Sequence, residues 1–215
     1  MARKHRSGAA KIKSQGTKSH TPKLDAQAWI DAALETLADG GIEAVRVEPL
    51  AAALAVTKGS FYWHFADRRA LLDAVFTQWA SGRIEAIREQ MASPEPPRMM
   101  LTRLADLYTR HGNVKGLAIE LAIRSFASGD ESASKLVHQV DTERLTHVTR
   151  LFGALGWELV DAQARAVLFY SYLFGQSLLD AEIATPVVSA RALDALLAEA
   201  PAQGASPDPE QQSPA

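Results

Sequence analysis

Apolar residues recur every three or four positions along most of this chain, and no stretch alternates between apolar and polar residues. This spacing is typical of amphipathic helices and predicts an all-α fold. The first helix is predicted to begin at Asp25, a favourable N-cap, and to end at the Gly40–Gly41 pair. The other predicted helices cover about 47–54, 58–65, 67–91 (with Asp67 as N-cap), 98–111, 115–128, 133–155, 159–183 and 188–199.

Residues 46–65 contain two short predicted helices separated by a tight turn at Ala55-Val56. Two helices joined in this way form a helix-turn-helix, whose second helix enters the major groove of DNA. A small core between these helices is predicted to consist of Leu50, Leu54, Val56, Phe61 and Phe65. The same spacing leaves lysine, serine, tyrosine, tryptophan and histidine side chains facing outward at positions 58, 60 and 62–64. Such a surface suits phosphates, sugars and base edges.

The stretch VTKGSFYWHFADRRALLDAV, at 56–75, resembles the helix-turn-helix and the following helix of the TetR family of transcriptional regulators. The resemblance extends over about 24–80 and includes the preceding DAALETLADGG segment. Beyond residue 90 the chain is similar to the family only in being all-helical. The resemblance implies an N-terminal three-helix DNA-binding domain over 24–74, followed by a larger helical domain for effector binding and dimerisation over 75–200.

The resemblance also implies which residues meet DNA. The start of the second helix matches a contact to the backbone or an outer base, and the start of the recognition helix matches contacts to base edges, where Lys58 can bond guanine O6 and N7. Packing of Tyr62 or Trp63 under the long helix, and a carbonyl partner for His64, are the structural alternatives. The predicted DNA-binding residues are Arg46, Val47, Thr57, Lys58, Gly59, Ser60, Tyr62, Trp63, His64 and Arg68.

Charge is distributed unevenly along the chain. The formal net charge is −2, yet residues 1–24 carry seven cations and no acid, while the rest holds sixteen cations and all 25 acids. A basic arm on an acidic body favours a polyanionic partner such as DNA. The arm, at 1–23, is predicted to be disordered and to follow the DNA backbone or enter the minor groove. A solvated tail without a role is the alternative, and the proline-rich segment 201–215 is predicted to be disordered as well.

Several chemistries have no sequence support. There is no cysteine, which excludes disulfides and thiolate metal sites. No apolar run approaches the roughly 18 residues of a membrane span, and the basic start is not followed by an apolar stretch, so a cytoplasmic protein is expected. Glycine-rich phosphate loops, GxSxG and HExxH are missing, so neither an enzyme nor a metal or cofactor is predicted. His138, Asp141 and His147 cannot converge from one helix on a metal and are expected at the surface or a dimer rim.

The larger domain offers candidates for a ligand site and an interface. Glu120 and Arg124 lie four residues apart on an apolar helix, which predicts either a buried structural pair or a polar anchor in a ligand pocket. The predicted ligand-binding residues are Tyr108, Glu120, Arg124 and Phe126. Because the helix at 159–183 is apolar on two faces, a homodimer is expected through the helices at 133–155 and 159–183.

The resulting expectation is a sequence-specific transcriptional regulator that binds double-stranded DNA. A repressor fits best, released from a near-palindromic operator when a small-molecule effector shifts the conformational population. The alternative is an architectural DNA-binding protein that responds to no ligand and has little sequence preference. An enzyme is disfavoured because no titratable groups converge.

Overall fold

The computed structural model describes residues 25–109, 113–176, 186–198 and 200, and every regular element in these residues is a helix. The predictions on the arm, on the segment 201–215 and on residues 177–183 lie outside this part of the chain. The helices are α1 (Ala26–Ala44), α2 (Val47–Ala53), α3 (Lys58–Phe61), α4 (Arg68–Met91), α5 (Pro97–Thr109), α6 (Val114–Ala127), α7 (Glu131–Ala154), α8 (Leu159–Gln176) and α9 (Pro186–Leu196).

The helix boundaries follow local signals in the sequence. The carboxylate of Asp25 accepts a hydrogen bond from the backbone N–H of Ala28 at 3.0 Å, and that of Asp67 accepts one from Ala70 at 2.8 Å. Both predicted N-caps are therefore confirmed. Gly41 adopts φ +70°, which only glycine tolerates freely, and it breaks the regular path of α1 near the predicted end of that helix.

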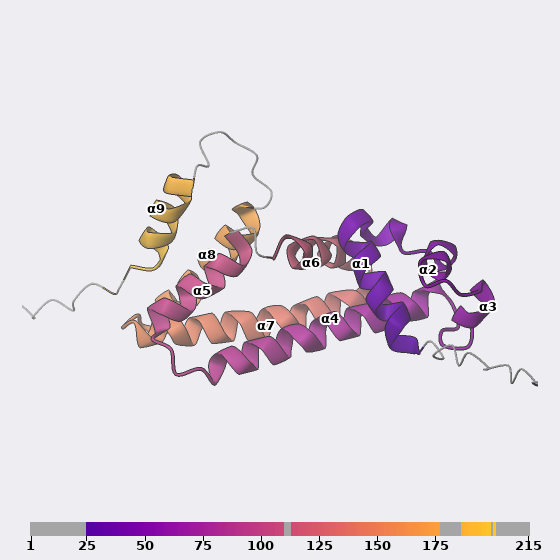
Figure 1. Ribbon diagram of the computed structural model, residues 1–215. Helices are drawn as coiled ribbons and strands as arrows, with labels where there is room; N and C mark the ends of the chain where they lie inside the picture. Colours follow the sequence, from indigo (N-terminus) through magenta and orange to yellow (C-terminus); the bar gives the residue numbers. More distant parts are fainter. Residues whose placement is uncertain (1–24, 110–112, 177–185, 199, 201–215) are drawn as a thin grey trace, which may run out of the picture.

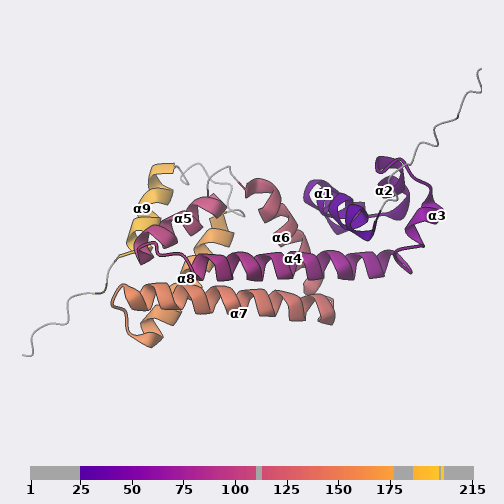
Figure 2. The same ribbon diagram turned by 60° about the horizontal axis from the view of Figure 1, so that its bottom comes forward.

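The two longest helices, α4 and α7, lie side by side and run in the same direction away from the α1–α3 head (Figures 1 and 2). At the head end Arg69, in the first turn of α4, pairs with Asp130, the N-cap of α7. At the far end Arg150 of α7 reaches the sulfur of Met91, the last residue of α4. The start of α4 therefore belongs to the head, while its remainder forms part of the body.

Buried side chains form two cores. The first lies among α1–α4, α6 and the start of α7, and its largest fully buried members are Trp29, Phe61 and Phe76. The second lies among α5, α7 and α8 and includes Phe152 and Phe169. Since α6 packs on α1 and shares the first core, the body is joined to the head by side-chain packing as well as by the continuous α4.

Candidate nucleic-acid interface

A tight turn between α2 and α3 sets the angle of the helix-turn-helix. Ala55 takes a positive φ of 54°, and the N–H of Val56 donates to the carbonyl of Ala51 at 2.9 Å. The third helix is shorter than the predicted 58–65, because α3 ends at Phe61 and the chain continues as a turn through His64. The N–H groups of His64 and Phe65 both donate to the carbonyl of Phe61, which keeps this turn compact.

The buried side of this segment anchors it to the head. Phe61 is fully buried, and its ring meets that of Trp29 edge to face with 5.2 Å between centroids. Leu50 and Phe65 are buried too, while Leu54 and Val56 are partly buried against the same core. The small core predicted between the two helices is therefore confirmed.

The opposite side of the segment is open to solvent. Trp63 is 88% exposed and Tyr62 is 54% exposed, so neither is packed under the long helix. Large aromatic side chains are costly to leave in water and mark surfaces that bind a partner. Of the other predicted DNA contacts, Arg46, Thr57, Lys58 and Gly59 are exposed, and Ser60 and His64 are half-buried.

Two of the ten predicted residues have other surroundings. The side chain of Val47 is only 8% exposed and belongs to the first core, so its contact with DNA stays a prediction that the burial of this side chain does not support. Arg68 donates to the backbone carbonyls of Val45, at 2.6 Å, and Ile42. This guanidinium ties the first residue of α4 to the end of α1, which is a structural role that sequence reasoning missed.

Lys58 has a partner that the sequence reasoning also missed. Its ammonium donates a hydrogen bond to the carboxylate of Glu48 on α2, across the turn of the motif. The hydrogen bond and the opposite charge lower the pKa of Glu48 and raise that of Lys58. Both side chains are more than half exposed, so the pair lies on the same open surface as Tyr62. A separation of ten residues carries no local signal for this contact.

A buried charge network occupies the body. Glu120 is fully buried and accepts hydrogen bonds from Arg144, at 2.6 and 2.7 Å, and from Arg124, at 2.9 Å. Tyr108 joins the network because its hydroxyl accepts a hydrogen bond from Arg144 at 3.1 Å. The guanidinium of Arg124 also forks onto both carboxylate oxygens of Asp141. The predicted Glu120–Arg124 pair is confirmed. The second partner of Glu120, Arg144, donates two shorter hydrogen bonds and was not anticipated.

The network controls the ionisation of Glu120. Burial alone would raise the pKa of this carboxyl, but the hydrogen bonds and charge of Arg144, with the charges of Arg124 and Arg83, lower it below its ordinary value. Glu120 is thus an anion held among cations in the interior. Removing one partner from such a cluster leaves a buried charge without compensation.

Two cavities adjoin the network and share Arg144 and Tyr170. One, of about 190 Å³, lies among α6, α7 and α8; the other, of about 140 Å³, lies among α4, α5, α7 and α8. The structure therefore brings Tyr108, Glu120 and Arg124 to one region. Phe126 is not among the residues that line either cavity, and its ring lies 5.3 Å from that of Phe76 in the first core, so its role as a ligand residue stays a prediction that this position does not support. The larger cavity is lined by Arg124, Asp141, Arg144, Leu145, Val167, Tyr170, Ser171 and Phe174.

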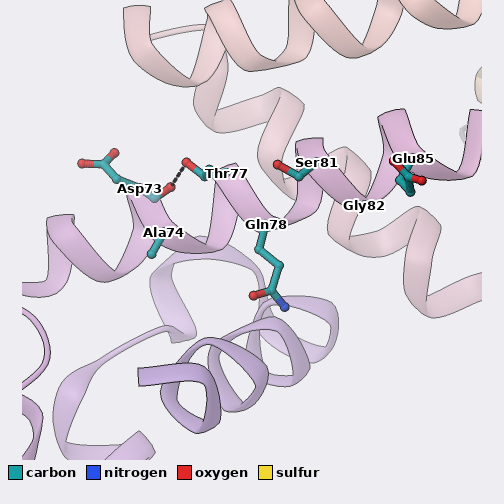
Figure 3. Close-up of a pocket in the computed structure, with 7 residues that line it drawn as sticks. All are labelled: Asp73, Ala74, Thr77, Gln78, Ser81, Gly82 and Glu85. Carbon is teal, nitrogen blue, oxygen red and sulfur yellow. Dashed lines mark hydrogen bonds between the residues drawn. The ribbon is translucent and has the colours of Figure 1, made fainter. Parts of the chain in front are cut away.

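An open groove runs along one face of α4 (Figure 3). Gln78 points from this face toward α1, where its amide oxygen accepts a hydrogen bond from Gln27 at 2.8 Å. The lining of the groove includes the acids Asp73 and Glu85, which pair with Arg69 and Arg88 of the same helix.

Exposed apolar side chains gather on α8. Leu159, Val160, Val167 and Leu168 are each more than half exposed, although the opposite face of the helix packs in the second core. By contrast α7 is packed against α4, α5 and α8, and His147 on this helix is buried rather than at the surface as expected. Burial and the nearby Arg150 lower the pKa of His147. The apolar surface available to a second copy thus lies on α8 more than on the helix predicted at 133–155.

The part of the chain that the structure describes contains neither a helix that could span a membrane nor a cluster of metal-binding side chains. None of its helices is long and apolar enough to cross a membrane. The same residues contain no group of three histidine, aspartate or glutamate side chains placed to hold a metal ion.

Known proteins match the N-terminal part of the chain. The sequence pattern of the bacterial regulatory proteins of the tetR family matches residues 30–75. The class C tetracycline repressor of Escherichia coli is 47% identical over 53 residues, and the class D repressor of the same species is 42% identical over 53 residues. Each alignment covers 25% of this chain and 24% of the relative, so the match spans about a quarter of these repressors.

Solved structures match over most of the chain, at low sequence identity. A transcriptional regulator from Rhodococcus sp. Rha1 has a TM-score of 0.66 at 17% identity, covering 81% of this chain and 94% of its own. A protein from Saccharomonospora viridis in complex with choline has a TM-score of 0.70 at 13% identity, covering 80% and 94%. These structures share the fold of head and body. Over its N-terminal part the chain is therefore similar to the tetR family of bacterial regulatory proteins.

Proposed function

We propose that this protein is a sequence-specific DNA-binding transcriptional regulator, and that α3 with the turn after it reads the operator. The observation that carries the proposal is the combination of a buried Phe61 with exposed Lys58, Tyr62 and Trp63 in the segment that matches the tetR family. A rigid anchor on one side presents donors and aromatic rings on the other. Lysine can bond guanine in the major groove, and the hydroxyl of tyrosine can bond phosphate.

The proposal includes a homodimer and release by an effector. The exposed apolar face of α8 is the proposed contact between two copies, and a two-fold axis would place two recognition segments about 34–36 Å apart on a near-palindromic operator. Binding of a small molecule beside Arg124 would act on α6, which packs on α1 of the head. An effector that favours a conformer with a different head spacing would weaken operator binding, as expected for a repressor.

Fluorescence anisotropy with the full chain at about 0.15 M salt tests the proposal. The two probes are duplex DNA from upstream of the protein's own coding region and a scrambled duplex of equal length and composition. Tight binding to the upstream duplex alone supports the regulator. Equal affinity for both, with nearly all of it lost as salt rises, would instead favour an architectural DNA-binding protein.

Replacing Glu48 with glutamine should strengthen binding to the scrambled duplex by a few-fold. The substitution removes a negative charge from the proposed DNA-facing surface and frees Lys58 from an exposed ion pair, which contributes little to stability. Discrimination between operator and scrambled DNA should fall, because the orientation of Lys58 is no longer fixed. Glu85→Gln, at a similarly exposed acid on α4, is the matched control. Weaker binding of Glu48→Gln to both duplexes would contradict this role for Glu48.

Removing residues 1–20, which carry six cations and no acid, should weaken DNA binding mainly at low salt. The slope of log affinity against log salt should become shallower by about 0.9 for every phosphate that the arm neutralises. The measurement is anisotropy at a series of salt concentrations, with deletion of residues 203–215, which hold two acids and no cation, as control. An unchanged slope in the N-terminal deletion would show that the basic arm does not contact DNA.

A further inference from the structure

The larger cavity beside Arg124 has a size suited to one small ring. Its volume is about 190 Å³, and an engineered apolar cavity of about 150 Å³ is known to hold benzene. Tyr170 and Phe174 lie stacked with 6.1 Å between ring centroids on one wall, and Leu145 and Val167 add aliphatic surface. The cavity combines these apolar walls with the guanidinium of Arg124.

The charges around the cavity do not balance. The guanidinium groups of Arg83, Arg124 and Arg144 all lie within 4 Å of Glu120, and Asp141 pairs with Arg124 and Arg144. These five side chains hold three positive and two negative charges. A single anion placed in the cavity would neutralise this excess.

The aromatic rings of the cavity, Phe174 and Tyr170, already lie close to guanidinium groups of the chain itself. The guanidinium carbon of Arg124 lies 4.6 Å from the ring centroid of Phe174, and that of Arg144 lies 5.7 Å from the centroids of Phe174 and Tyr170. A quaternary ammonium ligand, such as the choline bound by the Saccharomonospora viridis protein, would compete with these groups and meet a positive excess. The cluster therefore favours an anion over a cation.

Arg124 is the guanidinium that can exchange its partner. Arg144 is 3% exposed and committed to Glu120 and Tyr108, whereas Arg124 is 24% exposed and its fork is held by Asp141, which is 34% exposed. A ligand carboxylate has the same planar geometry as Asp141 and can accept the same two parallel hydrogen bonds. Displacing Asp141 leaves that side chain close to solvent.

We infer that this cavity binds a small carboxylate with a single ring, and that Arg124 binds the carboxylate in competition with Asp141. The inference rests on the proposed effector-responsive regulator and names the chemical class of its effector. The ring would lie against Tyr170 and Phe174, and the carboxylate would replace Asp141 at the guanidinium.

The test compares matched ligands by isothermal calorimetry on the full chain. The carboxylates are benzoate and phenylacetate, the neutral isosteres are benzamide and phenylacetamide, and the cations are benzylamine and choline. At least one carboxylate should bind about tenfold or more tightly than its own amide, because the amide cannot form the charge-assisted pair. Equal or weaker binding of both carboxylates relative to their amides, or preferred binding of a cation, overturns the inference.

Two pairs of variants locate the site. Ser171→Trp fills the cavity and should weaken benzoate binding at least tenfold, while Val187→Trp, exposed on α9 and outside the lining, should leave it unchanged. Arg124→Gln should abolish the preference for benzoate over benzamide, whereas Asp141→Asn should strengthen benzoate binding by removing the competing anion. Weaker benzoate binding in a folded Asp141→Asn variant would contradict the exchange.

Operator binding by the ligand-free protein is measured in parallel. Failure of every carboxylate with operator binding intact overturns the ligand inference alone. A protein that binds benzoate but discriminates between no two duplexes overturns the regulator proposal and leaves the cavity assignment standing.

Discussion

Replacing Lys58 and Tyr62 together with alanine is expected to abolish sequence-specific DNA binding while the protein stays folded. Both side chains are more than half exposed, so their removal costs little packing. One good base contact is worth about 1–3 kcal/mol of discrimination, and the phosphate contact of tyrosine adds to it. Operator affinity should therefore fall by about 100-fold or more, measured by anisotropy at fixed salt.

The control for this double variant is Lys135→Ala with Met99→Ala, two exposed side chains outside the head. It should bind the operator as the unchanged protein does. Thermal unfolding of both double variants should occur within a few degrees of the unchanged protein. A large drop in melting temperature in the head variant alone would show that Lys58 or Tyr62 supports the core. Unchanged operator affinity would show that α3 is not the reading element.

Replacing Glu120 with leucine is expected to destabilise the protein by about 3–5 kcal/mol. The leucine leaves the guanidinium of Arg144, 3% exposed, without the carboxylate that accepts two of its hydrogen bonds. Urea unfolding at neutral pH measures the effect. Glu131→Ala breaks an ion pair with Lys135 in which both side chains are more than 70% exposed, and it should cost less than about 1 kcal/mol. Equal effects of the two substitutions would contradict a structural role for the buried network.

The carboxyl of Glu120 also makes the free energy of unfolding depend on pH, in a direction that follows from its lowered pKa. The pKa of Glu120 is lowered in the folded protein from the 4.5 of the free side chain, because Arg144 and the nearby arginines outweigh the effect of burial. Its ionised form therefore adds stability above about pH 4.5, and this part is lost as the pH falls through the lower folded value. The difference in unfolding free energy between the unchanged protein and Glu120→Gln should shrink on acidification. A difference that stays constant from pH 7 to pH 3 would contradict this.

Local signals in the sequence predicted the helical fold well. The three-and-four spacing of apolar residues predicted the helices, and the carboxylates of Asp25 and Asp67 cap helices as expected. The glycine pair at 40–41 marked the break in α1, because Gly41 requires a positive φ. These features depend on residues within a few positions of one another, which is the range over which helix propensity and capping act.

Contacts between distant residues were not predictable in the same way. Arg68 reaches the carbonyls of Ile42 and Val45, and Arg144 reaches Glu120 on another helix, 24 residues away. Val47 was assigned to DNA by its position in the motif, but the rotation of α2 turns its side chain into the core. In each case the outcome depends on how helices pack, and no spacing along one helix encodes that.

The measurement that tests the central claim most directly is a binding selection from a pool of random duplexes, carried out with the unchanged protein and with Lys58→Ala/Tyr62→Ala. The account predicts that the unchanged protein enriches one near-palindrome with half-sites about one helical turn apart, and that the variant enriches none. This selection does not depend on where the natural operator lies. Absence of any enriched sequence, or the same sequence enriched by both proteins, would contradict the assignment of α3 and its following turn as the reading element of a DNA-binding regulator.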